Sequence, residues 1–134
     1  MSLDDPSLPI ALAMVMGHDF IYRRDEDEVE MVGPFQRLAV RHFPYEMACI
    51  NIYLELTDAQ GYVEGKIRCL NSDGSPVFES DSHRIRFDDP MQVVKVMFRI
   101  QDCRFPRPGM YHVRFLCGDQ VVTERRLELL KRER

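Results

Sequence analysis

Apolar and polar residues alternate with a period of two along most of the chain. In the clearest case, residues 48–57, one face carries Ala48, Ile50, Ile52, Leu54 and Leu56. A period of two indicates a strand, because a helix brings only every third or fourth residue to the same face. Three later segments repeat the pattern, and their expected inward residues are Val63, Gly65, Ile67 and Cys69, then Val94, Val96, Phe98 and Ile100, and finally Tyr111, Val113, Phe115 and Cys117.

Other segments predict strands from less regular patterns. Residues 10–16 are apolar on both alternations, which fits either a strand covered on both faces or a short buried helix. Gly17 follows and favours a strand end or a bulge, and residues 20–22 then predict a second short strand. Residues 76–87 predict one polar edge strand. The alternation of the last strand slips near Arg125, which indicates a bulge there.

Turn residues separate these strands. Asp73 and Gly74 predict a hairpin turn in which glycine supplies the positive φ angle. A Pro-Gly corner precedes the strand that contains Tyr111, so the hydroxyl of this tyrosine is expected to tie the loop back to the sheet, as in a tyrosine corner. The residues for which we expect a structural role are Pro108, Gly109, Tyr111, Gly118, Asp119, Asp73 and Gly74.

The domain organisation follows from these elements. About eight or nine short strands with turns roughly every 8–12 residues are typical of an antiparallel β-sandwich or barrel. A chain of 134 residues suits one domain, and no helical segment alternates with the strands to form a parallel α/β sheet. We expect an irregular lead-in over residues 1–9, a single β-sandwich domain over residues 10–131 and a charged tail over residues 132–134.

Composition and charge narrow the classes of partner. Hydrophobic residues make up 45% of the chain and charged residues 30%, the balance of a folded globular protein. The net charge of −4 gives no broad attraction to nucleic acid, so no nucleic-acid partner is expected. No apolar run approaches the roughly 20 residues that cross a bilayer, and acids stand where a signal peptide carries bases. We therefore expect a cytoplasmic protein with no membrane partner.

Several residue types that bind metals are present, but without the spacing of a metal motif. They are His18, His42, His83 and His112, with Cys49, Cys69, Cys103 and Cys117. In a cytosolic chain the cysteines are expected to be reduced, buried thiols that pack as small apolar side chains. No nucleotide-binding loop or nucleophile elbow occurs. We expect no catalytic, metal-binding or cofactor-binding residue and no cofactor.

Charged and exposed patterns supply weaker hypotheses. The acidic run of residues 25–30 lacks the spacing of a calcium loop and is expected to be a solvated hairpin tip. A basic, aromatic sheet face is an alternative to a mixed solvent face, with the residues Lys66, Arg68, Lys95, Arg99, Arg114, Tyr53 and Tyr62. Outward methionines and a tyrosine favour a protein contact instead, namely Met91, Met97, Met110 and Tyr53.

Four features together carry a resemblance to a known family. They are the early strand over residues 10–16, residues 32–35 followed by the corner at 42–44, the hairpin at 71–75, and residues 108–115 leading to Gly118 and Asp119. Over nearly its whole length the chain resembles a group of short, mostly bacterial proteins of unknown function. The resemblance implies an immunoglobulin-like β-sandwich and supplies no activity, cofactor or catalytic residue. We therefore expect an all-β fold, an antiparallel immunoglobulin-like β-sandwich of about eight strands.

A strand-only pattern without a convergent chemical site favours binding over catalysis. We expect a non-catalytic module that binds a protein partner or associates with itself as a homo-oligomer. The alternative is a β-sandwich that binds a metal or small ligand through a His/Cys cluster or the turn aspartates Asp73, Asp88, Asp89 and Asp119.

Overall fold

The computed structural model describes residues 8–23, 25 and 28–133, and these residues form ten strands. In chain order they are β1 (Ile10–Arg23), β2 (Glu28–Pro34), β3 (Arg37–Val40), β4 (Tyr45–Thr57), β5 (Gly61–Leu70), β6 (Pro76–Glu79), β7 (His83–Phe87), β8 (Val94–Phe105), β9 (Gly109–Cys117) and β10 (Gln120–Lys131). Within the described residues no helix is long and apolar enough to cross a membrane. Most of the predicted lead-in, residues 26 and 27 of the acidic run, and the last residue of the predicted tail lie outside the described residues.

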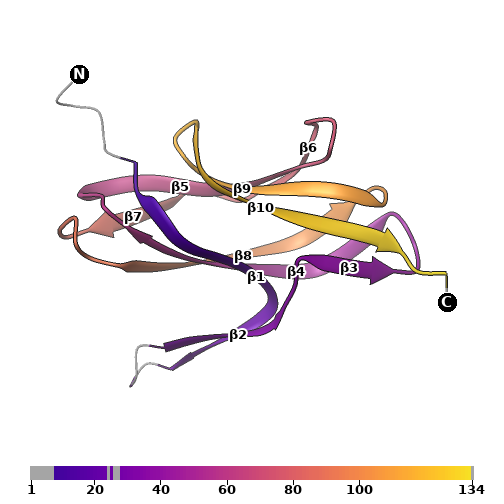
Figure 1. The fold of residues 1–134 in the computed structure, drawn as a ribbon, viewed down its shortest axis with the longest axis horizontal. Coiled ribbons are helices and arrows are strands. Elements are labelled where there is room, and N and C mark those ends of the chain that lie inside the picture. The colour runs from indigo at the N-terminus through magenta and orange to yellow at the C-terminus, as the bar shows by residue number, and fades with distance from the viewer. Residues whose placement is uncertain (1–7, 24, 26–27, 134) are drawn as a thin grey trace.

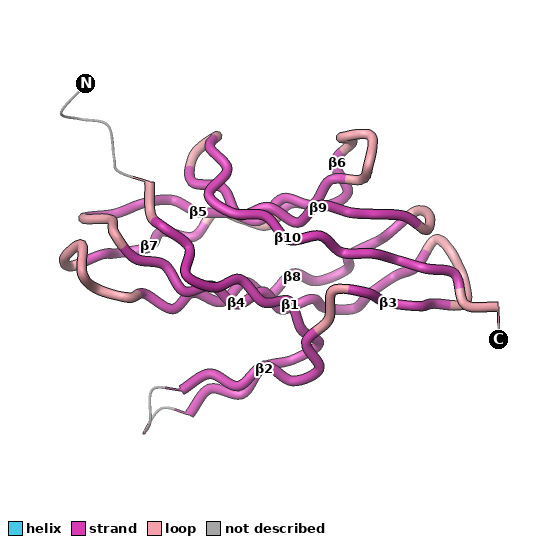
Figure 2. The backbone as a smooth tube through the Cα atoms, viewed as in Figure 1, coloured by secondary structure: helices cyan, strands magenta, loops and turns pink. Residues whose placement is uncertain are grey.

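The strands form two sheets that pack face to face (Figure 1; Figure 2). Sheet A has the strand order β2-β1-β4-β8, and sheet B has the order β3-β10-β9-β5-β6, with β7 also paired to β5. Neighbouring strands are antiparallel, except that β3 runs parallel to β10. The predicted all-β sandwich is confirmed, although it contains ten strands in its described residues.

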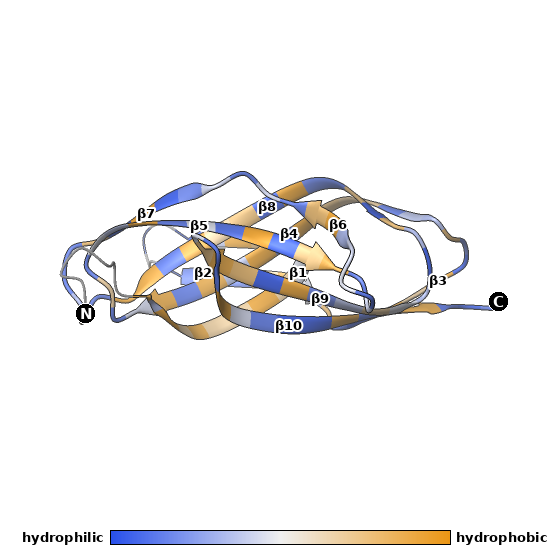
Figure 3. Cartoon of the chain, turned by 90° about the horizontal axis from the view of Figure 1, so that it is seen from above, coloured by the Kyte–Doolittle hydropathy of each residue, from blue (hydrophilic) through white to orange (hydrophobic). Residues whose placement is uncertain are grey.

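The core lies between the sheets and is built from alternate side chains of each strand. Along the strands, hydrophobic and hydrophilic residues alternate, as the hydropathy colouring of Figure 3 shows. The largest fully buried side chains are Tyr111, Phe87, Phe98, Phe105, Phe115, Met16, Ile50, Ile52, Leu54, Leu56, Ile67 and Leu127. Burying one Leu, Ile or Phe side chain contributes about 1.5–3 kcal/mol, so this layer is the main source of stability. The inward residues predicted for β5, β8 and β9 all point into it or pack against it.

The predicted inward position of Ala48 is wrong. Ala48 is exposed, whereas Met47 and Ile50 on either side are buried, so the alternation of β4 skips a residue there. The neighbouring strand β8 skips at the facing position, where Asp102 is exposed and has a left-handed φ of +58°. Because both strands change phase together, the pairing register of β4 and β8 continues on either side of the irregularity.

Two other boundaries differ from the prediction. Residues 76–87 form two strands, β6 and β7, and at the break the hydroxyl of Ser80 accepts the backbone N–H of Ile67 at 2.8 Å. The serine hydroxyl thus takes the place of a backbone carbonyl as the hydrogen-bond acceptor in the sheet at this point. The slip predicted near Arg125 lies earlier in β10, where the register shifts between Val121 and Thr123.

Strand β1 changes its partner at Gly17. Residues 10–17 pair with β4, and residues 17–23 pair with β2. Residues 20–22 are therefore part of β1 and not the separate strand that was predicted. The second half of β1 and β2 form a hairpin that projects from sheet A on the side away from sheet B (Figure 1). We term this hairpin, which is described over residues 17–23, 25 and 28–34, the arm.

Candidate functional site

The arm has one apolar face and one mixed face. Directly opposite residues of an antiparallel pair lie on the same face, so the pairing register assigns each side chain. The apolar face, which is turned towards sheet A, carries Phe20, Tyr22, Val29 and Met31. The opposite face carries Asp19, Ile21, Arg23, Glu28, Glu30 and Val32.

Two glycines and a buried polar residue lie at the root of the arm, the place where it leaves sheet A. Asn51, on the outer face of β4, is 1% exposed, and its side-chain amide donates to the carbonyl of His18 at 3.0 Å. A Cβ at Gly17 would lie 2.4 Å from the Sδ atom of Met31, so a larger residue there would displace the Met31 side chain. Gly33 has a φ of +61°, in the left-handed region that glycine adopts without strain. These residues set the direction in which the arm leaves sheet A.

A groove of about 400 Å³ lies between the apolar face of the arm and the outer face of sheet A. The arm contributes Phe20, Tyr22 and Val29, and sheet A contributes Tyr53 and Met97. Residues 92–96, which lead into and begin β8, line the rest of the groove. Since β8 is the last strand of sheet A, the groove runs beside an edge of that sheet. Its volume is within the range of ligand-binding clefts, and its walls are mostly apolar.

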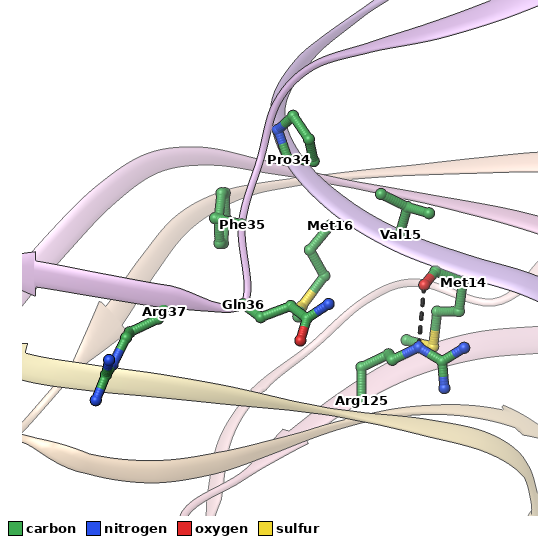
Figure 4. A pocket seen from close by; sticks show the side chains of 8 residues that line it. All are labelled: Met14, Val15, Met16, Pro34, Phe35, Gln36, Arg37 and Arg125. Atoms are coloured by element: carbon green, nitrogen blue, oxygen red, sulfur yellow. Dashed lines mark hydrogen bonds between the residues drawn. The ribbon is translucent and has the colours of Figure 1, made fainter.

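A second hollow, of about 470 Å³, lies where the sandwich is open between β1 and β10 (Figure 4). Its apolar wall includes Met14, Met16 and Phe35, and its polar side includes Arg37 and Arg125. Figure 4 shows the Arg125 side chain reaching from β10 to β1, where its Nε atom donates to the carbonyl of Met14 at 3.2 Å. Arg37 forms an ion pair with Glu128 at 2.6 Å. Arg125 thus joins the two sheets and Arg37 is paired within sheet B, so both guanidinium groups already have partners. This makes the hollow a weaker candidate ligand site than the groove beneath the arm.

The outer face of sheet B is basic. Its outward positions carry seven cations, Arg37, Lys66, Arg68, Arg84, Arg86, Arg114 and Arg126. They carry four acids, Glu64, Glu79, Glu124 and Glu128. These strands thus present a net charge of +3 on that face, although the whole chain has a net charge of −4. We term this surface the basic face.

Two carboxylates on the basic face are each shared between two basic side chains. Glu79 contacts Lys66 at 2.7 Å and Arg68 at 3.4 Å, and the hydrogen bond from Lys66 is the main reason why the pKa of Glu79 is lowered. Glu124 contacts Arg114 at 2.7 Å and lies 3.4 Å from the Nδ1 atom of His112. The hydrogen bond from Arg114 is the largest cause of the lowered pKa of Glu124. Because each of these carboxylates faces two basic side chains, basic side chains outnumber acidic ones on this surface.

The predicted corner brings Tyr111 into the core, where it is 1% exposed. Its hydroxyl donates to the carbonyl of Arg107 at 2.5 Å and accepts the backbone N–H of the same residue at 3.3 Å. Burial is the main cause of the raised pKa of this hydroxyl. The Arg107 guanidinium forms an ion pair with Asp73 at 3.2 Å, so the corner and the predicted Asp-Gly hairpin are joined.

The other predicted structural residues lie in turns, except Gly109, which begins β9. Gly74, Gly109 and Gly118 have positive φ angles of +89°, +148° and +60°. Pro108 is exposed in the corner, and Asp119 is exposed in the turn between β9 and β10. These positions define the fold, and none of them lines the groove beneath the arm.

The alternative metal ligands are not gathered together in the described part of the chain. No group of three His, Cys, Asp or Glu side chains there could hold a metal ion. Two of the four turn aspartates form ion pairs with arginines instead, Asp73 with Arg107 and Asp88 with Arg86 at 2.8 Å. Two histidines pack on phenylalanines. The ring of His83 stacks on that of Phe98 with 4.3 Å between the centroids, and the ring of His18 is tilted against that of Phe35 at 4.7 Å.

Three of the four cysteines are buried in the core. Desolvation is the main cause that raises the pKa of Cys69 and of Cys103 to about 12 and that of Cys117 to about 11. Cys49 is half-buried on β4. All four are free thiols. A thiol that ionises only at such a pH is a poor nucleophile at neutral pH.

The basic, aromatic surface considered from the sequence is divided between two sheets. Tyr53, Lys95 and Arg99 lie on sheet A. Lys66, Arg68, Arg114 and Tyr62 lie on sheet B, on the opposite side of the sandwich. That set does not form one face. Among the methionines expected at the surface, Met91 is 88% exposed, whereas Met97 and Met110 are half-buried.

The groove residues were not recognised from the sequence. Residues 20–22 are all apolar and residues 29–31 alternate, and the charged residues between them have the composition of a hairpin tip. Together these two signals predict a hairpin with one apolar face. Nothing in the local pattern indicates that this face lies over Tyr53 and Met97, because that depends on the partner change at Gly17.

Residues 18–130 match a family model described as a family of unknown function, DUF6941. The chain belongs to this family. The match to DUF6941 thus covers nearly all of sheet B, most of sheet A and nearly all of the arm, and the description of the family assigns no activity. No curated protein matches the chain.

The chain also has limited likeness to solved structures. A glycosyl hydrolase family 2 member from Bacteroides cellulosilyticus DSM 14838 is 18% identical, with a TM-score of 0.46. The match covers 63% of this chain and 12% of that one, so this DUF6941 chain corresponds to about an eighth of the length of that enzyme.

Proposed function

We propose that this DUF6941 protein is a non-catalytic protein-binding module and that the groove beneath the arm is its binding site. The observation that carries the proposal is the apolar face of the arm, which stands over sheet A and leaves about 400 Å³ between Phe20, Tyr22 and Val29 on one side and Tyr53 and Met97 on the other. Aromatic residues and methionine are enriched in the buried centres of protein interfaces.

An extended segment of a partner fits this groove better than a globular surface does. The groove is bounded by the arm and runs beside the edge strand β8. When a peptide adds to a sheet edge, main-chain hydrogen bonds provide affinity, and pockets for alternate side chains provide specificity. An apolar groove beside a sheet edge offers both kinds of contact. We therefore propose a partner segment with apolar residues at every second position.

The polar groups with perturbed pKa values support binding over catalysis. Perturbed groups in a cleft are candidates for chemistry, but here Cys69, Cys103 and Tyr111 lie in the core and Glu79 and Glu124 belong to ion pairs on sheet B. None of these residues lines the groove.

A library of random peptides displayed on phage tests the proposal across partner segments of any sequence. Selected peptides are synthesised with a fluorophore, and their affinity is measured by fluorescence anisotropy. We expect alternating apolar residues in the selected sequences. Tyr22→Ser should weaken binding by at least about tenfold, since an aromatic anchor at an interface is worth more than 1 kcal/mol.

Tyr62→Ser is the matched control. Tyr62 is 51% exposed on sheet B, and Tyr22 is 49% exposed on the arm, so both variants remove a similar aromatic surface. The control should bind the selected peptides with unchanged affinity. The proposal is wrong if no peptide is enriched, or if Tyr22→Ser and Tyr62→Ser have equal effects.

A further inference from the structure

We propose that the protein associates head to tail with a second copy of itself, the acidic arm of one copy docking on the basic face of the next. This contact uses the outward face of the arm and leaves the groove beneath it available. The proposal is therefore independent of the peptide-binding function, and either one can fail without the other.

The charge of the chain is strongly segregated. By sequence, residues 18–34 contain six acids and two arginines, so this segment of 17 residues has a net charge of −4, equal to that of the whole chain. Among the described arm residues, Asp19, Asp25, Glu28 and Glu30 are all exposed, and Glu30 is partly neutralised by Arg23 at 2.9 Å. The remainder of the chain is neutral in sum, yet the outward positions of sheet B carry a net charge of +3.

The arm cannot neutralise the basic face of its own copy. It projects from sheet A on the side away from sheet B, so the acidic and basic surfaces lie on opposite sides of the molecule (Figure 1). They can meet only between copies. A contact between two different surfaces of identical chains is heterologous, and repeated contacts of this kind build chains or closed rings.

Apolar side chains are present on both surfaces, so the contact does not depend on charge alone. On the outward face of the arm, Ile21 is 45% exposed and Val32 is 42% exposed. On sheet B, Tyr62 is 51% exposed, and the guanidinium carbon of Arg84 lies 3.8 Å from the centroid of its ring. Interfaces combine apolar contacts of this kind with a charged rim.

The first test is the dependence of the assembly on salt. Charge pairs at a solvent-exposed contact are screened as the Debye length falls from about 30 Å at about 0.01 M salt to about 3 Å at about 1 M. Sedimentation velocity should show species of at least twice the monomer mass of 15.8 kDa at low salt. At high salt the protein should sediment as a monomer.

Two variants separate the surfaces of the contact. The arm variant, Asp25→Lys with Glu28→Lys, removes the acidic charge of the arm. The face variant, Arg84→Glu with Arg126→Glu, removes the positive charge of the basic face without touching the ion pairs of Glu79 and Glu124. Each variant alone should be monomeric at low salt. An equimolar mixture should form dimers and nothing larger, because only the arm of the face variant and the basic face of the arm variant remain intact.

Matched controls change the same charges elsewhere. Glu46→Lys and Arg104→Glu alter exposed residues that pair across β4 and β8 in sheet A, and each variant should assemble like the unmodified protein. Circular dichroism melting curves confirm that every variant is folded. A monomeric unmodified protein at low salt overturns the proposal, as does a mixture that stays monomeric. Salt-sensitive binding of polyglutamate or of a thymidine oligonucleotide by a monomeric protein would assign the basic face to a foreign anionic partner instead.

Discussion

Tyr111 and Asn51 are buried polar residues that fix two loops of the chain in space. The hydroxyl of Tyr111 bonds to Arg107 at the corner before β9, and the amide of Asn51 bonds to His18 at the root of the arm. A buried polar group is costly when its partner is removed, so each bond favours one loop geometry over others. The Oδ1 atom of Asn51 has no partner among the described residues, so Asn51 makes one hydrogen bond at the arm root, whereas Tyr111 makes two at the corner.

Removal of the Tyr111 hydroxyl tests its role in stability. We expect Tyr111→Phe to lower the free energy of unfolding by about 1 kcal/mol, the typical net value of one intramolecular hydrogen bond. Urea unfolding followed by circular dichroism measures the difference. Tyr45→Phe is the control, because the rings of Tyr45 and Tyr111 both pack on Phe105. Equal stability of Tyr111→Phe and the unmodified protein would show that the corner does not need this bond.

The ionised carboxylate of Glu124 is expected to contribute to the stability of the folded protein in a pH-dependent way. Its pKa is lowered, first by the hydrogen bond from Arg114 and then by His112, so its ionised form is favoured in the folded state. The resulting stabilisation is present above the ordinary glutamate pKa of about 4.3 and is lost as the pH falls through the lower folded value.

The matching experiment compares Glu124→Gln with the unmodified protein in urea at several pH values. We expect the variant to be less stable at pH 7 by up to about 1 kcal/mol, since the pair is partly exposed. The difference should shrink towards zero in strong acid. Glu133→Gln, at an exposed position near the end of the chain, should show no difference at any pH. A stability difference that grows on acidification would contradict the assigned role.

At the scale of elements, glycines decide how closely strands approach one another. Gly17 lets β2 lie against β1 where the arm begins, and a Cβ there would collide with the flexible end of Met31. Gly65, in the middle of β5, faces the core, and a Cβ there would lie 2.6 Å from the ring of Phe115. The ring belongs to a fully buried residue, so it has little freedom to move.

Gly65→Ala should therefore destabilise the sandwich by about 1–3 kcal/mol, the usual effect of overpacking a core. Thermal unfolding followed by circular dichroism measures the change in melting temperature. The double variant Gly65→Ala with Phe115→Leu supplies the control, because the smaller side chain leaves room for the added methyl group. It should lose less stability than the sum of the two single variants. Additive effects would mean that the predicted collision does not occur.

At the scale of the whole molecule, the sandwich separates buried thiols from charged outer surfaces. Cys69, Cys103 and Cys117 lie between the sheets. The basic face lies outside sheet B, and the arm lies outside sheet A. This arrangement places both proposed binding surfaces on the exterior and leaves the cysteines with a packing role. The same arrangement predicts how the intact protein reacts with thiol reagents.

We expect at most one fast-reacting thiol in the folded protein when it is treated with Ellman's reagent. Cys49 is half-buried and should react first, whereas burial keeps the other three in the thiol form at neutral pH. Unfolding in guanidinium should expose all four thiols. Cys49→Ser should abolish the fast reaction. Rapid reaction of two or more thiols in the folded state would show that the core opens on the timescale of the assay.

Local sequence patterns were sufficient to predict the inward residues of strands that bury one face and expose the other. In β5 and β9, each inward residue could be named from the period of two, because a strand with one buried face must alternate. The hydroxyl contact of Tyr111 and the positive φ angles of Gly74 and Gly118 also follow from short-range turn geometry. The prediction failed where β4 and β8 change phase together, since each strand there adjusts to its neighbour.

The sequence by itself determined the all-β class, most of the core and the main turns, because these depend on residues that are close along the chain. The tertiary structure alone decided which residues form the candidate surfaces. Lys95 and Lys66 have the same outward pattern in the sequence, yet they lie on opposite sides of the sandwich. Likewise, Phe20 and Met97 line one groove because β1 changes partner at Gly17. Such contacts depend on long-range strand pairing, and no local alternation encodes them.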